Sequence, residues 1–227
     1  MADGVNMNDK KTIMTLSGVM VGTIVLIVAF AILASRPSKP AIINIANSPS
    51  LGSGSAKVTV VEFSDFQCPS CQTFASAMLP VLEKEYQNTV RFVFKYFPLY
   101  EIHNLAKLSA QSAFCAGKAP NAKAGSEILN DKFWKYHDLL MNNPSAWEKT
   151  PEKFTEYAVQ MGLNKDEFLK CQNSDEAVNA VMVDRSEGDR IGVNSTPSFF
   201  VNGEKMVGLL TLEQWRKKLE EKLNSIK

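Results

Sequence analysis

Two cysteines separated by two residues constrain this chain most; they belong to the run Phe63-Ser64-Asp65-Phe66-Gln67-Cys68-Pro69-Ser70-Cys71. The nearly continuous apolar and β-branched segment Val58–Phe63 precedes them and predicts a central strand covered on both faces. Pro69 fits the first turn of a helix, where a missing N–H costs little. We therefore expect a strand, a C-x-x-C motif and a helix in immediate succession.

The position of the first cysteine predicts its chemistry. At a helix N-terminus the first backbone N–H groups lack intrahelical partners, and the macrodipole adds partial positive charge. Because a thiolate is stabilised there, we expect Cys68 to be an acidic, solvent-facing nucleophile. Cys71, one turn further on, would be buried and would resolve a mixed disulfide. The alternatives are a passive disulfide, or a zinc site completed by Cys115 and Cys171, although the chain has no second C-x-x-C motif.

The N-terminal part of the chain predicts a membrane segment. From Ile13 to Ala34 there is no charged residue, and as a helix these residues would span about 33 Å, enough for a bilayer core. We expect residues 1–12 in the cytoplasm and residues 13–34 as an uncleaved transmembrane anchor, with cleavage near Ala29-Phe30-Ala31 as the alternative. Lysine and arginine flank both ends almost equally, so the orientation follows from the four cysteines, which suit an oxidising compartment outside the cytoplasm.

The remaining chain divides into a linker and one domain. Residues 35–56 are rich in proline, serine and glycine, which predicts a flexible linker with a short strand at Ala41–Ile45. Residues 57–227 have the length of a single domain. The formal net charge of the whole chain is +1, which argues against binding to nucleic acid through a basic surface.

The pattern downstream of the motif predicts an alternation of strands and helices. Pro80 should kink the helix that begins at Pro69. A helical stretch should occupy residues 103–191, and Thr211 with Gln214 should form a capping box that opens the last helix. The remaining predicted elements are a strand at Val90–Phe97, helix starts near Thr150-Pro151, Asn164 and Ser174, and a hairpin of Ser198–Val201 and Lys205–Val207 around Asn202-Gly203.

This order, together with the C-x-x-C motif and the later run Thr196-Pro197-Ser198-Phe199-Phe200-Val201-Asn202-Gly203, resembles the DsbA-like branch of the thioredoxin superfamily. The resemblance covers nearly all of residues 57–227. It implies an α/β thioredoxin fold with a helical insert at about residues 100–191. It also implies a thiol–disulfide oxidoreductase with Cys68 and Cys71 as the catalytic pair, a substrate-binding cis-proline loop at Thr196-Pro197, no cofactor and no metal.

Further site residues follow from the resemblance. Glu62 and Lys95 are ionisable residues inside apolar strands, where a partner or a function is expected. The resemblance implies that they relay the proton of Cys71. It also implies a structural disulfide between Cys115 and Cys171, with two buried free thiols as the alternative.

The dipeptide between the cysteines bears on the strength of oxidation. Ser70 replaces the histidine found in DsbA, and serine offers a hydroxyl in place of a positive charge. We therefore expect the Cys68 thiolate to be less stabilised and the couple to be less oxidising than in DsbA. Asp65 is left without a role, and the single histidines His103 and His137 are interpreted as core or surface residues.

The sequence thus predicts a membrane-tethered enzyme, with its catalytic domain on the extracytoplasmic side, that forms disulfides in reduced exported proteins. The resemblance implies re-oxidation by a quinone-linked membrane oxidase. A disulfide reductase or isomerase with the same site is the alternative, because the direction depends on the redox potential. A tethered metal-binding module is a third hypothesis, and no His, Met or third Cys near Cys68 favours it.

Overall fold

The computed structural model describes residues 39–118 and 130–226. The expected cytoplasmic N-terminus at residues 1–12 and the anchor at residues 13–34 lie outside them. Within the described ranges, no helix combines the length and the apolar character that crossing a membrane requires. One compact unit begins at Pro40 and continues to the end of the chain.

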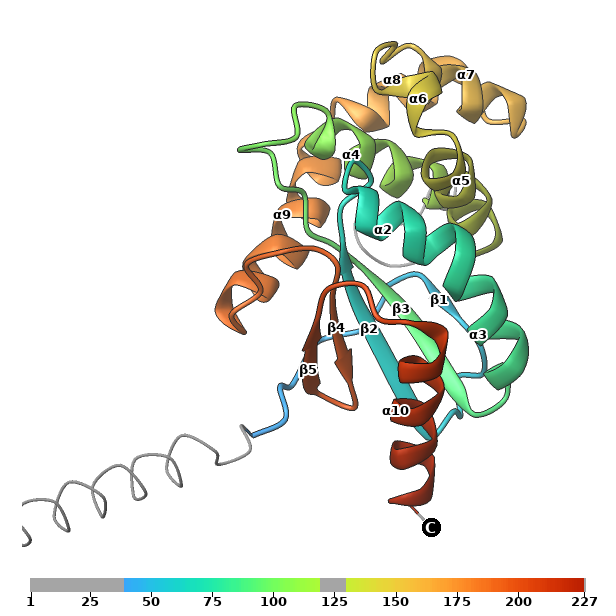
Figure 1. Ribbon diagram of the computed structural model, residues 1–227. Coiled ribbons are helices and arrows are strands. Elements are labelled where there is room, and N and C mark those ends of the chain that lie inside the picture. Colours follow the sequence, from blue (N-terminus) through green and yellow to red (C-terminus); the bar gives the residue numbers. More distant parts are fainter. Residues whose placement is uncertain (1–38, 119–129, 227) are drawn as a thin grey trace, which may run out of the picture. The chain divides into compact units, whose positions relative to one another are not determined.

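A sheet with the strand order β1-β3-β2-β4-β5 forms the centre of this unit (Figure 1). Strands β2 and β3 are parallel, and the other neighbours are antiparallel. The two strands predicted before and after the first helix are confirmed, as is the hairpin, whose turn residues Asn202 and Gly203 both have positive φ. The strands are β1 Ser50–Leu51, β2 Val58–Ser64, β3 Val90–Tyr96, β4 Ser198–Val201 and β5 Glu204–Val207.

Three helices begin where the capping residues predict, and the helix expected near Thr150-Pro151 begins at Lys153. The side chains of Asn164 and Ser174 cap α8 and α9, and Thr211 forms the expected capping box with Gln214 at the start of α10. The described helices are α2 Pro69–Thr73, α3 Leu79–Tyr86, α4 Ala106–Gly117, α5 Asn130–Asn142, α6 Pro144–Trp147, α7 Lys153–Gln160, α8 Lys165–Gln172, α9 Asp175–Arg190 and α10 Leu212–Asn224. From β2 onward the predicted order β, α, β, helical insert, ββ, α is therefore confirmed, and the short strand β1 precedes it.

The expected kink at Pro80 takes a specific form. A π-helical segment, Phe74–Met78, separates α2 from α3, and Pro80 lies in the first turn of α3. Proline lacks the N–H that an uninterrupted α-helix would need there, and a π-helical turn is a known way to absorb such a break. The long predicted helix thus changes its winding before the proline.

The two faces of the sheet have separate cores. Residues of one face, such as Val60 and Phe94, pack in a large core with residues of α2, α3, α5 and α10. Residues of the other face, such as Val61 and Phe63, form a smaller cluster. Gly188 of α9 lies against this second face, where a Cβ atom would come within 2.6 Å of the Phe97 ring. The absence of a side chain at Gly188 therefore lets α9 approach the sheet closely.

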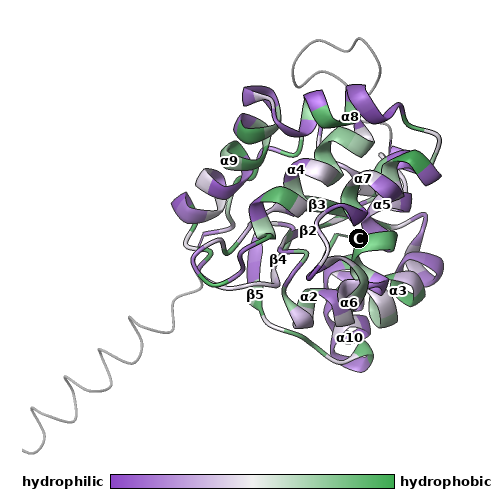
Figure 2. Cartoon of the chain, turned by 90° about the horizontal axis from the view of Figure 1, so that it is seen from above, coloured by the Kyte–Doolittle hydropathy of each residue, from purple (hydrophilic) through white to green (hydrophobic). Residues whose placement is uncertain are grey.

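The surface helices are amphipathic. Four buried residues of α9 recur at intervals of three or four positions, and Figure 2 shows hydrophilic and hydrophobic residues alternating along α8 and α9. This spacing places the buried residues on one face of the helix. The four residues are Ala177, Val181, Asp184 and Gly188.

The expected linker over residues 35–56 is too long, because the compact unit already includes residues 40–56. Ala41, Ile43 and Ile45 pack against the smaller core cluster, while the residues between them are exposed. The backbone N–H of Ala41 donates to the Gly203 carbonyl at 2.8 Å. The expected strand at Ala41–Ile45 is wrong. The segment alternates partly buried and exposed side chains as a strand does, but the strand that pairs with β3 is β1, further along the chain. Its apolar face explains why a proline- and serine-rich stretch belongs to the domain.

Candidate active site

Cys68 lies at the junction between the sheet and the first helix. It is the N-cap residue of α2, in an extended conformation with φ −77° and ψ 119°, and Pro69 follows in the first turn. The Cys68 carbonyl accepts a hydrogen bond from the Gln72 N–H at 3.0 Å. The unpaired N–H groups of the first helical turn are therefore directed toward the Cys68 side chain.

The surroundings of Cys68 favour its thiolate. Its pKa is lowered to about 5, first by a hydrogen bond from the Cys71 thiol and further by the Thr196 hydroxyl and the backbone N–H groups of Cys71 and Ser70, while burial opposes the shift. Only 7% of the residue is exposed to solvent. Cys68 is thus an acidic thiol, although it is less exposed than expected from the sequence.

Cys71 has the opposite character. It is completely buried, and its pKa is raised well above the usual value, first by burial and then by its contact with Cys68 and the charge of Glu62. A buried thiol of high pKa holds its proton, whereas its neighbour releases one at neutral pH. The two sulfurs therefore differ strongly in nucleophilicity and in leaving-group quality.

Glu62 lies on β2 in the core beneath the motif. Burial raises the pKa of its carboxyl to about 8, the nearby Ser64 side chain opposes the shift, and the charge of Cys68 adds to it. Its Oε1 atom has no hydrogen-bond partner among the described residues. Because the charge of Glu62 also acts on Cys71, the arrangement can exchange a proton between this carboxyl and the buried thiol.

The loop before β4 faces the first cysteine. The Thr196–Pro197 peptide bond is cis, and the Cys68 thiol donates to the Thr196 carbonyl at 3.3 Å. The Thr196 hydroxyl is buried and has no fixed hydrogen-bond partner within the described ranges, so it is free to donate to a thiolate. The structure thus brings residues that are 128 positions apart in the sequence together at one site.

Lys95 does not join this site. Paired residues of parallel strands share a face of the sheet, and Glu62 pairs with Phe94 while Lys95 pairs with Phe63. Lys95 therefore lies on the opposite face from Glu62, and the expected relay between them is wrong. Its ammonium contacts Asp184 at 2.7 Å and Glu187 at 3.2 Å, both on α9. The buried lysine is thus part of an ion cluster that joins α9 to β3.

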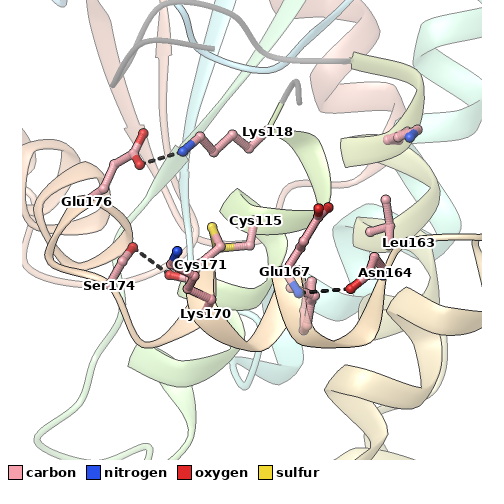
Figure 3. A pocket seen from close by; sticks show the side chains of 11 residues that line it. Cys115, Lys118, Leu163, Asn164, Glu167, Lys170, Cys171, Ser174 and Glu176 are labelled. Atoms are coloured by element: carbon pink, nitrogen blue, oxygen red, sulfur yellow. Dashed lines mark hydrogen bonds and ion pairs between the residues drawn. A yellow bond between two sulfur atoms is a disulfide. The ribbon is translucent and has the colours of Figure 1, made fainter. Parts of the chain in front are cut away.

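The second cysteine pair lies away from the motif. Cys115 of α4 and Cys171 of α8 are joined by a disulfide with an S–S distance of 1.99 Å. Figure 3 shows this bond beside a cavity of about 450 Å³, next to an ion pair between Lys118 and Glu176. The disulfide connects the first and a later helix of the insert, and the cavity beside it has no contact with Cys68.

Sequence reasoning left two residues near the motif without a role. The carboxylate of Asp65 is fully buried, and it lies 2.8 Å from His103 Nδ1. The sequence alone could have indicated a role for Asp65, because it is an acidic residue directly between a buried strand and the cysteines. His103 could not be recognised, because its partner lies 38 residues earlier in the chain. Across the described ranges, no three His, Cys, Asp or Glu side chains gather in an arrangement that would hold a metal ion.

The chain resembles a known protein family and named bacterial proteins in sequence. The family model Thioredoxin matches residues 45–221. The probable disulfide bond formation protein D of Bacillus cereus is 32% identical over 168 residues, which cover 68% of this chain and 69% of that protein. The Na⁺/H⁺ antiporter NhaA 3 of Salinispora tropica is 32% identical over 71% of this chain, but this chain spans only 22% of the antiporter's length.

A solved structure has the same fold. The crystal structure of oxidised BdbD from Bacillus subtilis aligns with a TM-score of 0.70 and 22% sequence identity. The alignment covers 83% of this chain and 100% of the BdbD chain. The described architecture is therefore a thioredoxin fold with a helical insert.

Proposed function

Because the chain belongs to the thioredoxin family, we propose that it is a DsbA-like thiol–disulfide oxidoreductase that acts through Cys68 and Cys71. One observation carries the proposal. Two thiols, three positions apart, have pKa values displaced in opposite directions, to about 5 for Cys68 and well above the usual value for Cys71. Such an asymmetric pair suits disulfide exchange, which needs one good leaving group and one resolving thiol.

The reaction starts from the oxidised Cys68–Cys71 pair. A substrate thiolate attacks the Cys68 sulfur, the Cys68–Cys71 bond breaks, and Cys71 leaves with the electron pair. A second substrate thiolate then attacks the substrate sulfur of the mixed disulfide and releases Cys68 as a thiolate. The substrate loses two electrons and gains a disulfide, and the enzyme pair is reduced to the thiolate of Cys68 and the thiol of Cys71.

Glu62 supplies the proton that this exchange requires. When Cys71 leaves, its sulfur is buried and needs a proton to become the stable thiol. With a pKa of about 8, Glu62 is mostly protonated at neutral pH and can donate to Cys71. In the reverse direction the carboxylate accepts the proton as Cys71 attacks. Lys95 has no part in this transfer, since it lies on the other face of the sheet.

The direction of exchange follows from the stability of the Cys68 thiolate. A thiol whose pKa falls from 9.0 to about 5 stabilises the reduced enzyme at neutral pH. After allowance for solvent screening, the gain is on the order of 2 kcal/mol, equivalent to roughly 40 mV. A stabilised reduced form makes the oxidised enzyme the stronger oxidant, so we favour the oxidase over the reductase or isomerase.

Substrates would be reduced, unfolded exported proteins. The edge beside Thr196-Pro197 offers backbone groups to an extended chain, and the exposed apolar residues Val207 and Leu209 follow nearby in the sequence. Residues 13–34 would anchor the enzyme in the cell membrane with the catalytic domain on the extracytoplasmic side. A quinone-linked membrane oxidase would then re-oxidise the pair.

Oxidation of a reduced two-cysteine peptide tests the proposed function. Wild-type protein should form the peptide disulfide, and Cys68→Ala should abolish this activity. The double variant Cys115→Ala/Cys171→Ala is the matched control, because it removes the other cysteine pair and should retain the activity while folded. A Cys68→Ala protein that oxidises the peptide at the wild-type rate would contradict the proposal. A potential in glutathione buffers below that of glutathione would instead assign a reductase.

A further inference from the structure

Asp65 is a buried carboxylate outside the catalytic pair. Its side chain is fully buried, so its oxygens need donors within the protein. Oδ1 accepts from the Gln67 N–H at 2.9 Å, and Oδ2 accepts from the Leu99 N–H at 2.8 Å. The third contact is His103 Nδ1, 2.8 Å from Oδ2. One carboxylate therefore joins the turn before the cysteines to the loop after β3.

The backbone of Asp65 contacts both cysteines. Its carbonyl accepts the Cys68 N–H at 3.0 Å. Its backbone N–H lowers the pKa of Cys71 and so partly offsets the rise that burial causes. The conformation of this one residue thus sets the position of the first cysteine and the surroundings of the second.

A second residue of the turn strengthens the same connection. Gln67 Oε1 accepts the Leu105 N–H at 2.5 Å, and Gln67 Nε2 lies 3.4 Å from Asn104 Oδ1. The loop held in this way, residues 97–105, projects from the domain between β3 and α4 (Figure 1). It includes Ile102, which is 74% exposed. Arg185 of α9 holds the first part of this loop through the Pro98 carbonyl, and the side chains of Asp65 and Gln67 join the loop to the turn before the motif.

We propose that Asp65 and His103 form a positioning pair that fixes the 65–68 turn, and with it the location of the Cys68 sulfur at the start of α2. The inference rests on the proposed function, since it concerns the same nucleophile. Neither residue touches the reacting sulfur through its side chain. His103 acts by donating Nδ1–H to Asp65, which holds the carboxylate in place to accept from Gln67 and Leu99. Without that donor only the Leu99 N–H holds Oδ2, so the carboxylate is fixed less firmly between the turn and the neighbouring loop.

Substitutions of His103 separate positioning from simple stabilisation. His103→Leu removes the donor, whereas His103→Asn places an amide N–H near the position of Nδ1 and should rescue it. Asp138→Asn is the matched control, because Asp138 contacts the chain's other histidine, His137, at 2.9 Å and is 61% exposed. The measurement is the thiolate absorbance of Cys68 against pH in reduced, folded protein, together with the rate of peptide oxidation.

We expect His103→Leu to weaken the acidity of Cys68 by tenfold or more and to slow peptide oxidation by a similar factor. His103→Asn and Asp138→Asn should stay within twofold of wild type. Asp65→Asn should have the larger effect, since one accepting oxygen becomes an NH₂ group and either Gln67 or Leu99 loses its acceptor. If Asp65→Asn does not fold, the His103 variants still test the positioning role, because His103 is partly exposed.

The outcomes distinguish this inference from the proposed function. A His103→Leu protein that melts at a lower temperature but keeps the wild-type acidity of Cys68 and the wild-type oxidation rate would overturn the positioning role. In that case the proposed function would stand. A wild-type Cys68 that titrates like a free cysteine would overturn the proposed function, and the positioning role with it.

Discussion

The two thiols of the C-x-x-C motif differ because one lies at a helix start and the other lies inside the core. Cys68 receives hydrogen bonds that stabilise negative charge, whereas Cys71 is surrounded by apolar groups and the carboxyl of Glu62. The same burial that raises the pKa of Cys71 also raises that of Glu62. One buried proton can therefore pass between these two groups with little change in the charge of the core.

Glu62→Gln should stabilise the folded protein and slow the exchange reaction. The folded-state pKa of about 8 lies above the ordinary value of 4.5, so ionisation of Glu62 lowers stability as the pH rises between these values. At neutral pH the substitution should raise the free energy of unfolding by about 2–4 kcal/mol. Denaturant unfolding at neutral pH and near pH 4 measures this, and an equal gain at both pH values would contradict the assignment.

Ser70→His should make the couple more oxidising. A protonated imidazole near the Cys68 sulfur would add positive charge where the wild type has a hydroxyl. Each unit by which the Cys68 pKa falls corresponds to about 1.4 kcal/mol, or roughly 30 mV in redox potential. Equilibration with glutathione buffers measures the change, and an unchanged or lower potential would contradict the expected stabilisation of the thiolate by a histidine at position 70.

At the scale of secondary-structure elements, β3 and α9 are joined by a buried ion cluster. Lys95 contacts Asp184 and Glu187, and Asp184 also accepts the Tyr96 N–H at 3.1 Å. Burial raises the pKa of Asp184, while Lys95 lowers it. The cluster thus holds α9 against the face of the sheet that carries Phe63. The redox site lies on the opposite face, with Glu62.

Lys95→Met should destabilise the fold without changing the chemistry. Removing the ammonium leaves buried carboxylates without their cation, which should cost about 3–5 kcal/mol. Lys218→Met is the control, since Lys218 pairs with the half-exposed Glu204 and should contribute less than about 1 kcal/mol. Unfolding by denaturant gives the stability, and thiolate titration gives the acidity of Cys68. An altered Cys68 pKa in the Lys95→Met protein would instead show that this lysine influences the redox site.

Local patterns predicted the elements that carry the chemistry. A strand, Pro69 and a helix start are sufficient to place Cys68, and the hairpin and capping residues were readable in the same way. The role of Lys95 was not readable, because its face depends on strand register and its partner lies 89 residues later. The same limit applies to Asp65 and His103. Contacts between distant residues depend on tertiary packing, which one sequence does not display.

At the scale of the whole molecule, the domain includes the segment that precedes its first long strand. Ile43 and Ile45 cover the second face of the sheet, and Asn44 N–H donates to Glu187 at 2.7 Å. The segment from Pro40 to β1 therefore contacts both the sheet and the ion cluster of α9. The composition of this stretch predicted a linker, but its alternating apolar residues place it in the core.

Two truncations test where the domain begins. Removal of residues 1–39 should leave the free energy of unfolding unchanged, because the compact unit starts at Pro40. Removal of residues 1–51 should lower it by more than about 3 kcal/mol, since the packed side chains of Ile43 and Ile45 and the β1 strand are lost. Denaturant unfolding of both proteins measures the difference. Equal stabilities would mean that residues 40–51 contribute nothing to the fold.

The acidity of Cys68 tests the central claim most directly. The ultraviolet absorbance of the thiolate in reduced protein, followed across the acid and neutral pH range, reports the titration of this sulfur. The account predicts a midpoint at a pH of about 5 that is absent from Cys68→Ala. A midpoint near the value of a free cysteine, about 8.5, would contradict it.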